Sequence, residues 1–96
     1  MFKELDPLLH SELRLAVISL LVGGGEAEFK VLKLKTGATA GNLSVQVQKL
    51  SDAGYIEVEK SFKGKYPLTT CRITELGIQA FNNYVDALKD YLSPKP

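Results

Sequence analysis

The chain has 96 residues, a length that suits one domain rather than two, and 45% of them are apolar, as in an ordinary globular protein. The net charge of +1 by itself indicates no class of partner. One cysteine excludes an intramolecular disulfide framework, and the longest nearly apolar stretch, residues 15–22, is too short to span a membrane. Since no apolar run follows a basic patch at the N-terminus, we expect a cytoplasmic protein with no membrane partner.

The first quarter of the chain predicts a helix. Asp6 is a good N-cap and Pro7 suits the first helical position, and apolar residues then recur at three- and four-residue spacing as far as Leu21. Ser11 offers a point at which the helix restarts after a short first turn. Three glycines at residues 23–25 end it, because glycine accepts the left-handed cap. The next three residues, 26–28, predict a connector or a single edge strand.

Two short helices follow. The first covers residues 29–36, and a tight turn at Gly37 separates it from a second helix that Thr39 caps and that runs to about Ala53. Spacings of four and three residues give this second helix a stripe that we expect to be buried: Leu43, Val47 and Leu50. Two short helices joined by a glycine-containing turn predict a helix-turn-helix over residues 29–54.

After residue 54, the spacing of the apolar residues changes from that of a helix to that of a strand. Apolar and basic residues alternate with Glu57, Glu59 and Ser61, and residues 68–73 are comfortable in a second strand. A lysine-rich turn joins the two, so we expect a hairpin over residues 55–73 with a basic tip. We expect a last helix that Thr74 caps and that runs to about Leu92, followed by a frayed tail at residues 93–96, of which 95 and 96 lie outside the residues that the structure describes.

Charge is distributed unevenly along the chain. Residues 29–72 carry eight basic and three acidic side chains, a balance of +5, whereas the two ends together carry −4. A basic middle between acidic ends is expected if the middle faces phosphate and the ends face something else.

In this order, the elements resemble the winged-helix transcriptional regulators of the MarR/ArsR-like kind from bacteria and archaea. The resemblance covers almost the whole chain and is carried by three stretches in the right order. These are LDPLLHS at residues 5–11 leading into LRLA at 13–16; GNLS at 41–44 followed by LSDAGYI at 50–56; and KSFKGKYP at 60–67 with TT at 69–70 and RITELG at 72–77.

The resemblance implies an α+β fold: a mostly α winged helix-turn-helix with a two- or three-stranded β-wing and a long C-terminal dimerisation helix. Residues 1–96 would be a single winged-helix DNA-binding domain, with the helix-turn-helix at 29–54, the wing hairpin at 55–73 and the C-terminal helix at 74–92. It implies a homodimer that binds double-stranded DNA sequence-specifically and represses transcription. It also leaves room for a small-molecule effector.

Two groups of residues are then candidates for DNA contact. Amide side chains can bond adenine edges and an aliphatic one can touch a thymine methyl, so the base-reading candidates are Ala40, Asn42, Ser44, Val45, Gln46 and Lys49, with Gln46 and Asn42 preferred. The candidates for the phosphate backbone are Thr39, Gln48, Lys60, Lys63, Lys65 and Arg72.

The last helix has a wider apolar stripe than a small body can cover, which predicts pairing with a second copy. The interface candidates are Leu5, Leu8, Leu9, Phe81, Tyr84, Val85, Leu88, Tyr91 and Leu92. An alternative stays open: Lys49 is the one basic residue in the second helix of the helix-turn-helix, so the same fold could be a protein-interaction module that does not bind DNA.

Catalytic and metal-binding patterns are missing from the sequence. His10 and Cys71 are single copies, whereas a metal site needs clustered thiolates or imidazoles. No glycine-rich phosphate loop or nucleophile elbow is present either. We therefore expect no enzyme activity, no metal and no cofactor.

Overall fold

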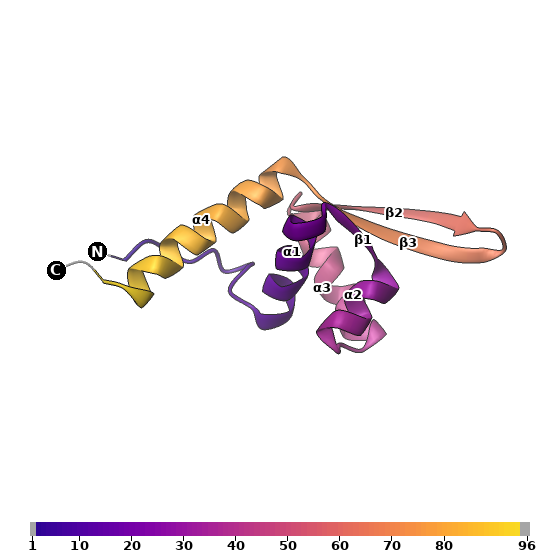
Figure 1. Cartoon of the computed structure of the whole chain (residues 1–96), viewed down its shortest axis with the longest axis horizontal. Coiled ribbons are helices and arrows are strands. Elements are labelled where there is room, and N and C mark those ends of the chain that lie inside the picture. Colours follow the sequence, from indigo (N-terminus) through magenta and orange to yellow (C-terminus); the bar gives the residue numbers. More distant parts are fainter. Residues whose placement is uncertain (1, 95–96) are drawn as a thin grey trace.

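The computed structural model describes residues 2–94, which form four helices and a three-stranded sheet (Figure 1). In chain order the elements are α1 Glu12–Gly24, β1 Glu26–Glu28, α2 Phe29–Thr36, α3 Ala40–Asp52, β2 Ile56–Lys63, β3 Tyr66–Ile73 and α4 Glu75–Leu92. The α+β winged helix-turn-helix that the sequence predicts is thereby confirmed. No helix within the described residues is both long enough and apolar enough to cross a membrane.

The N-terminal helix is interrupted where the sequence offered a restart. Asp6 begins a single turn, in which the backbone N–H groups of Leu9 and His10 donate to its carbonyl oxygen and its side chain accepts from the N–H of Leu8. Ser11 is extended, with φ −151° and ψ 127°, and α1 begins after it at Glu12. The break leaves Leu9 fully buried in the core.

Helices α1, α2 and α3 enclose the core together with one side of the sheet. The predicted stripe of α3 is confirmed, because all three of its residues are buried. The other core side chains come from the N-terminal turn, α1, α2, the strands and α4: Leu9, Val17, Ile18, Leu21, Leu32, Ile56, Cys71 and Tyr84.

The sheet is antiparallel in the order β1-β3-β2, so the short segment at residues 26–28 is an edge strand. The register pairs Val58 with Cys71 and Lys60 with Thr69, and the pairing continues to Lys63 and Tyr66. Cys71 is buried, so the face that it shares with Val58 and Lys60 is the one turned toward the helices. The other face carries Glu59 and Thr70.

Two arms project from this body in opposite directions: the β2–β3 hairpin, which we call the wing, and α4 (Figure 1). The molecule measures 59 × 25 × 21 Å, and its radius of gyration is 14.6 Å. A compact domain of this length would have a radius of gyration of about 12.5 Å. The excess reflects the two arms, each of which presents surface that the body does not cover.

The start of α4 is joined to the segment between α3 and β2 at Tyr55. The N–H of Thr74 donates to the carbonyl oxygen of Tyr55, and the Thr74 hydroxyl donates to the carbonyl oxygen of Gly54. Gly77 packs so closely that a Cβ there would lie 2.1 Å from the carbonyl oxygen of Tyr55. Only glycine fits at that position.

The side chain of Tyr55 adds the N-terminal segment to this joint. Its hydroxyl donates a hydrogen bond to the carboxylate of Asp6. This hydrogen bond, then burial and then the Asp6 charge, raise the pKa of Tyr55 from 10.0 to about 12. The folded protein therefore favours the protonated phenol.

We predict that Tyr55→Phe lowers the free energy of unfolding at neutral pH by about 1 kcal/mol, because it removes one intramolecular hydrogen bond. The pKa is raised on folding, so this stabilisation is complete below pH 10.0 and is lost as the pH rises toward about 12. Denaturant unfolding of wild type and variant across the alkaline range measures the difference. A difference that grows with pH would contradict the assignment.

Candidate nucleic-acid interface

One side of α3 is open to solvent. Successive residues of a helix are 100° apart, so the positions opposite the buried stripe are those near Gly41, Val45 and Gln48, and all three are exposed. The remaining exposed positions of α3 are Ala40, Asn42, Ser44, Lys49 and Asp52. Thr39 caps the helix, since its hydroxyl accepts from the N–H of Asn42 at 3.2 Å. The exposed side is therefore made of small, amide and aliphatic side chains, with one lysine and one aspartate in the last turn.

Gln46 differs from the other candidates of this helix because it is half-buried and already bonded. Its carboxamide oxygen accepts from the guanidinium of Arg14 on α1, and its nitrogen donates to Asn42 at 3.0 Å. Arg14 in turn donates to the carbonyl oxygen of Leu8. Residue spacing could not indicate Arg14 as part of this surface, because its partner lies 32 residues away.

Gln48, which the sequence assigned to the phosphate backbone, lies in the middle of the exposed side. Its amide nitrogen donates to Asp52 one turn later, at 2.8 Å. This bond is exposed and lies within one helix, so water can replace it at little cost. The carboxamide of Gln48 is more accessible to a ligand than that of Gln46.

A groove of about 330 Å³ separates α3 from the wing and brings the two regions together. Ala40, Ser44 and Gln48 line it from α3, and Val58, Lys60 and Thr69 line it from the sheet. The side of α3 that borders the groove and the helix-facing side of the wing therefore form one continuous surface. The sequence predicted the α3 residues and Lys60, but Thr69 could be assigned to this side only from the strand register.

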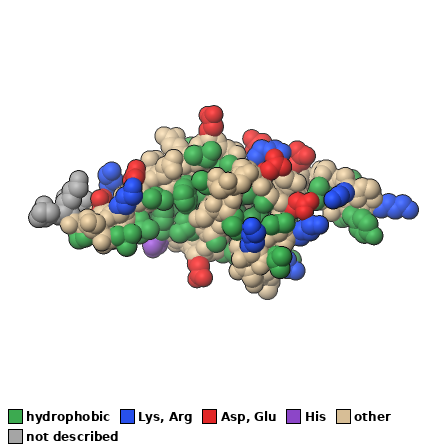
Figure 2. All heavy atoms as spheres, viewed as in Figure 1, with side chains coloured by type: hydrophobic (Ala, Val, Ile, Leu, Met, Phe, Trp, Pro, Cys, Tyr) green, Lys and Arg blue, Asp and Glu red, His purple; other side chains and the backbone are tan. Residues whose placement is uncertain are grey.

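Lys60 borders this groove, and the other two lysines of the wing, Lys63 and Lys65, lie beyond it at the hairpin tip. Lys60, Lys63 and Lys65 are exposed, and no ion pair among the described residues includes them. Figure 2 shows basic side chains at the tip of the wing. Their charges are consequently not neutralised within residues 2–94.

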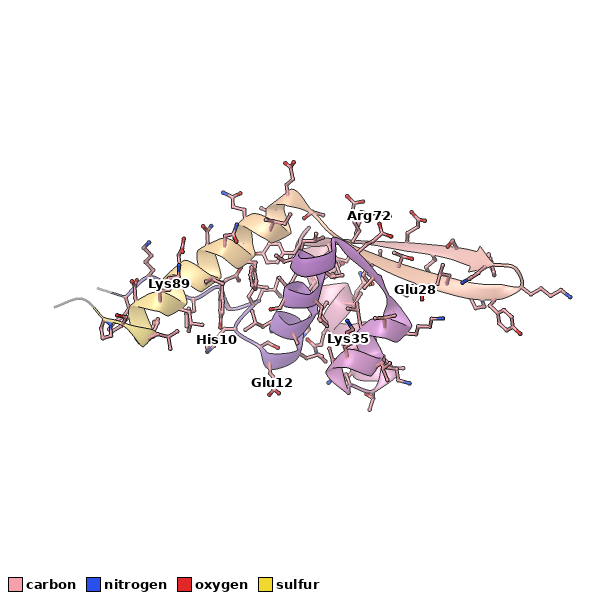
Figure 3. All side chains as sticks on the ribbon, in the orientation of Figure 1. His10, Glu12, Glu28, Lys35, Arg72 and Lys89 are labelled. Atoms are coloured by element: carbon pink, nitrogen blue, oxygen red, sulfur yellow. The ribbon has the colours of Figure 1, made fainter. Side chains whose placement is uncertain are left out.

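Arg72, the fourth basic candidate of the hairpin, lies elsewhere. It belongs to the central strand at the base of the wing (Figure 3), and its guanidinium lies 3.3 Å from Glu26 and 3.9 Å from Glu59. These carboxylates flank it on the sheet face turned away from the helices. The structure thus separates Arg72 from the three lysines.

The candidates for a dimer interface are divided between the core and the surface. Leu9 and Tyr84 are buried within the chain, where the Tyr84 hydroxyl lies 3.0 Å from Nδ1 of His10. The candidates at the far end of α4 are exposed, and Tyr91 stacks on Phe2 with ring centroids 4.6 Å apart. Phe2 is an exposed aromatic that the apolar spacing of the sequence did not indicate. Five candidates are half-buried: Leu5, Leu8, Phe81, Val85 and Leu88.

A second cavity, of about 440 Å³, lies between the N-terminal segment and the first half of α4. Its polar lining comes from Glu4, Asp6, Tyr55, Gln79 and Asn83. The size is within the range of small-molecule sites in proteins. The Tyr55–Asp6 hydrogen bond forms part of its wall.

The single-copy residues do not gather into a metal site. Within residues 2–94, no three His, Cys, Asp or Glu side chains come together as a metal ion would require. Cys71 is buried, and burial raises the pKa of its thiol. A buried, protonated thiol in a strand is a packing residue.

Known proteins share both the sequence pattern and the fold of this chain. A family model described as winged helix DNA-binding domain matches residues 13–92. An uncharacterized protein of Methanocaldococcus jannaschii is 38% identical over 79 residues, which cover 81% of this chain and 85% of that protein. The family is one of DNA-binding domains and not of enzymes.

Solved structures give the same fold. A transcriptional regulator homologue from Pyrococcus horikoshii OT3 superposes with a TM-score of 0.83 at 24% identity, covering 88% of this chain and 84% of that one. PadR of Bacillus subtilis, solved in complex with operator DNA, gives a TM-score of 0.69 at 19% identity, covering 78% of this chain and 48% of PadR. The predicted winged-helix resemblance is confirmed, whereas the MarR/ArsR-like subtype stays a prediction.

Proposed function

Because this chain belongs to the family of winged helix DNA-binding domains, we propose that it is a cytoplasmic transcriptional regulator that binds specific double-stranded DNA sites as a homodimer. We take repression, by occluding a promoter, as its mode of action. The observation that carries the proposal is the continuous surface of α3 and the wing, on which small polar side chains and lysines without ion-pair partners among residues 2–94 lie side by side.

In this proposal α3 enters the major groove and reads base edges. From Ala40 to Gln48 its exposed side carries no charged side chain, so this part of the helix can approach the bases closely, whereas Lys49 and Asp52 lie in the last turn. We assign Gln48 to a bidentate pair with adenine and Val45 to a thymine methyl, because both side chains are exposed. Ala40, Asn42, Ser44 and Lys49 flank them.

Arg14 and Gln46 support this base recognition rather than perform it. Arg14 links α1 to α3, and its guanidinium bonds carbonyl and carboxamide oxygens, neither of which carries a full charge. It therefore brings a positive charge close to α3. A phosphate beside the helix is the partner that this charge suits.

The wing supplies the attraction to phosphate that α3 lacks. Lys60, Lys63 and Lys65 extend the charged surface away from the body, whereas Arg72 is held by two carboxylates. Phosphate contacts release counterions, so they give affinity that falls steeply with salt.

The second copy is expected at the opposite end of the molecule. The exposed apolar groups there are Phe2, Tyr91 and Leu92, and Leu92 is 76% exposed. Together with the half-buried Val85 and Leu88, Tyr91 and Leu92 form an apolar stripe along α4. A second copy related by a two-fold axis would cover this stripe. The cavity between the N-terminal segment and α4 is our candidate for an effector site, because it lies between α4 and the Tyr55 joint.

The alternative is a winged helix that docks a protein and ignores DNA. The exposed Val45 and the single lysine of α3 are the features that favour it. The two functions differ in their response to salt, since binding that is driven by phosphate weakens steeply as salt rises. Titrations with duplex DNA at several salt concentrations therefore separate them.

We predict that Lys63→Ala with Lys65→Ala weakens binding to all duplex sequences alike and flattens the salt dependence by about one unit for each phosphate that is no longer neutralised. Titrations of a labelled duplex at several salt concentrations measure the slope. Lys3→Ala with Lys89→Ala is the matched control, because it removes two charges near the far end of α4. A decrease in affinity that is confined to one duplex sequence would contradict a role in binding phosphate.

We predict that Gln48→Ala reduces the difference in binding free energy between the specific and the non-specific duplex by about 1–3 kcal/mol, the discrimination that one bidentate pair provides. Gln46→Ala is the matched control and should have the smaller effect, because Arg14 already occupies its carboxamide oxygen. Both are titrated at fixed salt against a site selected from random duplexes and a scrambled duplex. If Gln46→Ala has the larger effect, Gln46 is the reader; if selection yields no consensus, the protein-docking alternative is favoured.

We predict that Tyr91→Glu with Leu92→Glu converts the dimer to a monomer, because it places charge in an apolar interface. Tyr84 is unsuitable for this test, since it is buried within the chain. Sedimentation measures the mass, and Leu34→Glu is the control because Leu34 is 83% exposed on α2. An unchanged dimer would locate the interface elsewhere.

A further inference from the structure

The wing carries an exposed phenylalanine that no other part of residues 2–94 covers. Phe62 is 73% exposed, although strands at the edge of a sheet usually end in charged or polar side chains. The three lysines of the wing already protect the hairpin from pairing with other strands. Phe62 therefore has no structural role that the fold accounts for.

The strand register fixes the side on which Phe62 lies. Phe62 pairs with Pro67, and Lys60 pairs with Thr69, so these residues share one face of the hairpin. Lys60 and Thr69 border the groove against α3. Phe62 consequently lies on the α3 side of the wing, two residues farther toward the tip than Lys60.

The tip fixes the backbone at Phe62 before any ligand binds. The ladder continues to the pair Lys63 and Tyr66, which leaves Gly64 and Lys65 as the whole turn. Gly64 has φ 63°, the left-handed conformation that glycine accepts in a tight turn. Phe62 is thus one pair away from a short turn, on paired backbone.

The surroundings of Phe62 favour nucleic acid over an apolar protein partner. Lysines precede and follow it at positions 60, 63 and 65, and a hydrophobic protein surface would have to desolvate those charges. The minor groove of DNA combines negative potential with a floor of base edges that apolar side chains can enter. Apolar wedges of this kind separate base steps and bend the duplex.

We propose that Phe62 inserts into the minor groove beside the α3 site and partly unstacks a flexible base step there, so that the wing reads the deformability of DNA. The inference rests on the proposed DNA binding and assigns sequence preference to a residue outside α3. Pyrimidine–purine steps such as TA are the easily kinked ones, whereas A-tracts are stiff. Wild-type protein should therefore prefer a duplex of alternating TA steps to an A-tract duplex of the same length.

The test compares Phe62→Ala with Tyr66→Ala on these two duplexes. Tyr66 is 78% exposed on the opposite face of the same tip, so it controls for removal of an aromatic ring and for any change in the hairpin. Phe62→Ala should bind the TA duplex about tenfold more weakly, roughly the contribution of one buried aromatic ring, and should no longer prefer it to the A-tract. Tyr66→Ala should keep both the affinity and the preference, and thermal melting checks that both variants are folded.

Two further measurements use the same duplexes. Energy transfer between dyes at the duplex ends should show a bend with wild type and a smaller one with Phe62→Ala. The chain contains no tryptophan, so Phe62→Trp introduces a single reporter, whose emission should be quenched by stacking on the TA duplex.

The outcomes separate this inference from the proposed function. If wild type binds DNA and Phe62→Ala binds and bends it equally well, the proposed insertion of Phe62 is wrong and the proposed DNA binding stands. Equal decreases in affinity for Phe62→Ala and Tyr66→Ala also overturn the insertion, because they indicate a general effect on the hairpin. Wild type that binds neither duplex at low salt overturns both proposals.

Discussion

The arrangement of the whole molecule depends on the contact between Gly77 and the carbonyl oxygen of Tyr55. That oxygen follows the end of α3 and precedes β2, and it accepts a hydrogen bond from the N–H of Thr74 at the start of α4. A side chain at position 77 would separate the two segments. The end of α3, the start of β2 and the start of α4 therefore meet at Tyr55, and the Tyr55 hydroxyl adds Asp6 to this joint.

This joint explains why the two arms project in opposite directions. The wing leaves it toward one end and α4 toward the other, so the surface proposed for DNA and the surface proposed for the second copy are separate (Figure 1). The cavity beside Tyr55 borders the joint itself. A ligand there would contact the N-terminal segment and α4 at once.

The sequence predicted those features that depend on local spacing. The stripe of α3, the caps at Thr39 and Thr74 and the strand alternation after Gly54 each follow from residues a few positions apart, and each is present in the structure. The sequence could not predict partners from distant parts of the chain. The bond between Arg14 and Gln46 is one such case, and the pairing of Arg72 with Glu26, 46 residues away, is another.

The exposure of Phe62 could not be predicted from residue spacing either. In the alternation of β2, Phe62 follows Ile56 and Val58 on the face turned toward the helices, and the alternation does not indicate how far along the strand that face is covered. Ile56 is buried because the helices reach it, whereas the hairpin extends past them before residue 62. How far the helices cover a strand depends on the tertiary structure. An apolar residue beyond the last covering helix is exposed even though it continues the pattern of the strand.

The weak charge of α3 determines how the proposed function must be divided among the elements. One lysine on the reading helix leaves most of the phosphate attraction to the wing, whose lysines have no ion-pair partners within residues 2–94. Two weak reading surfaces bind tightly only when they are linked, because the second one then binds at a high effective concentration. In the proposed function, a chain with a mildly polar α3 therefore depends on both arms: the wing for attraction to DNA and α4 for the second copy.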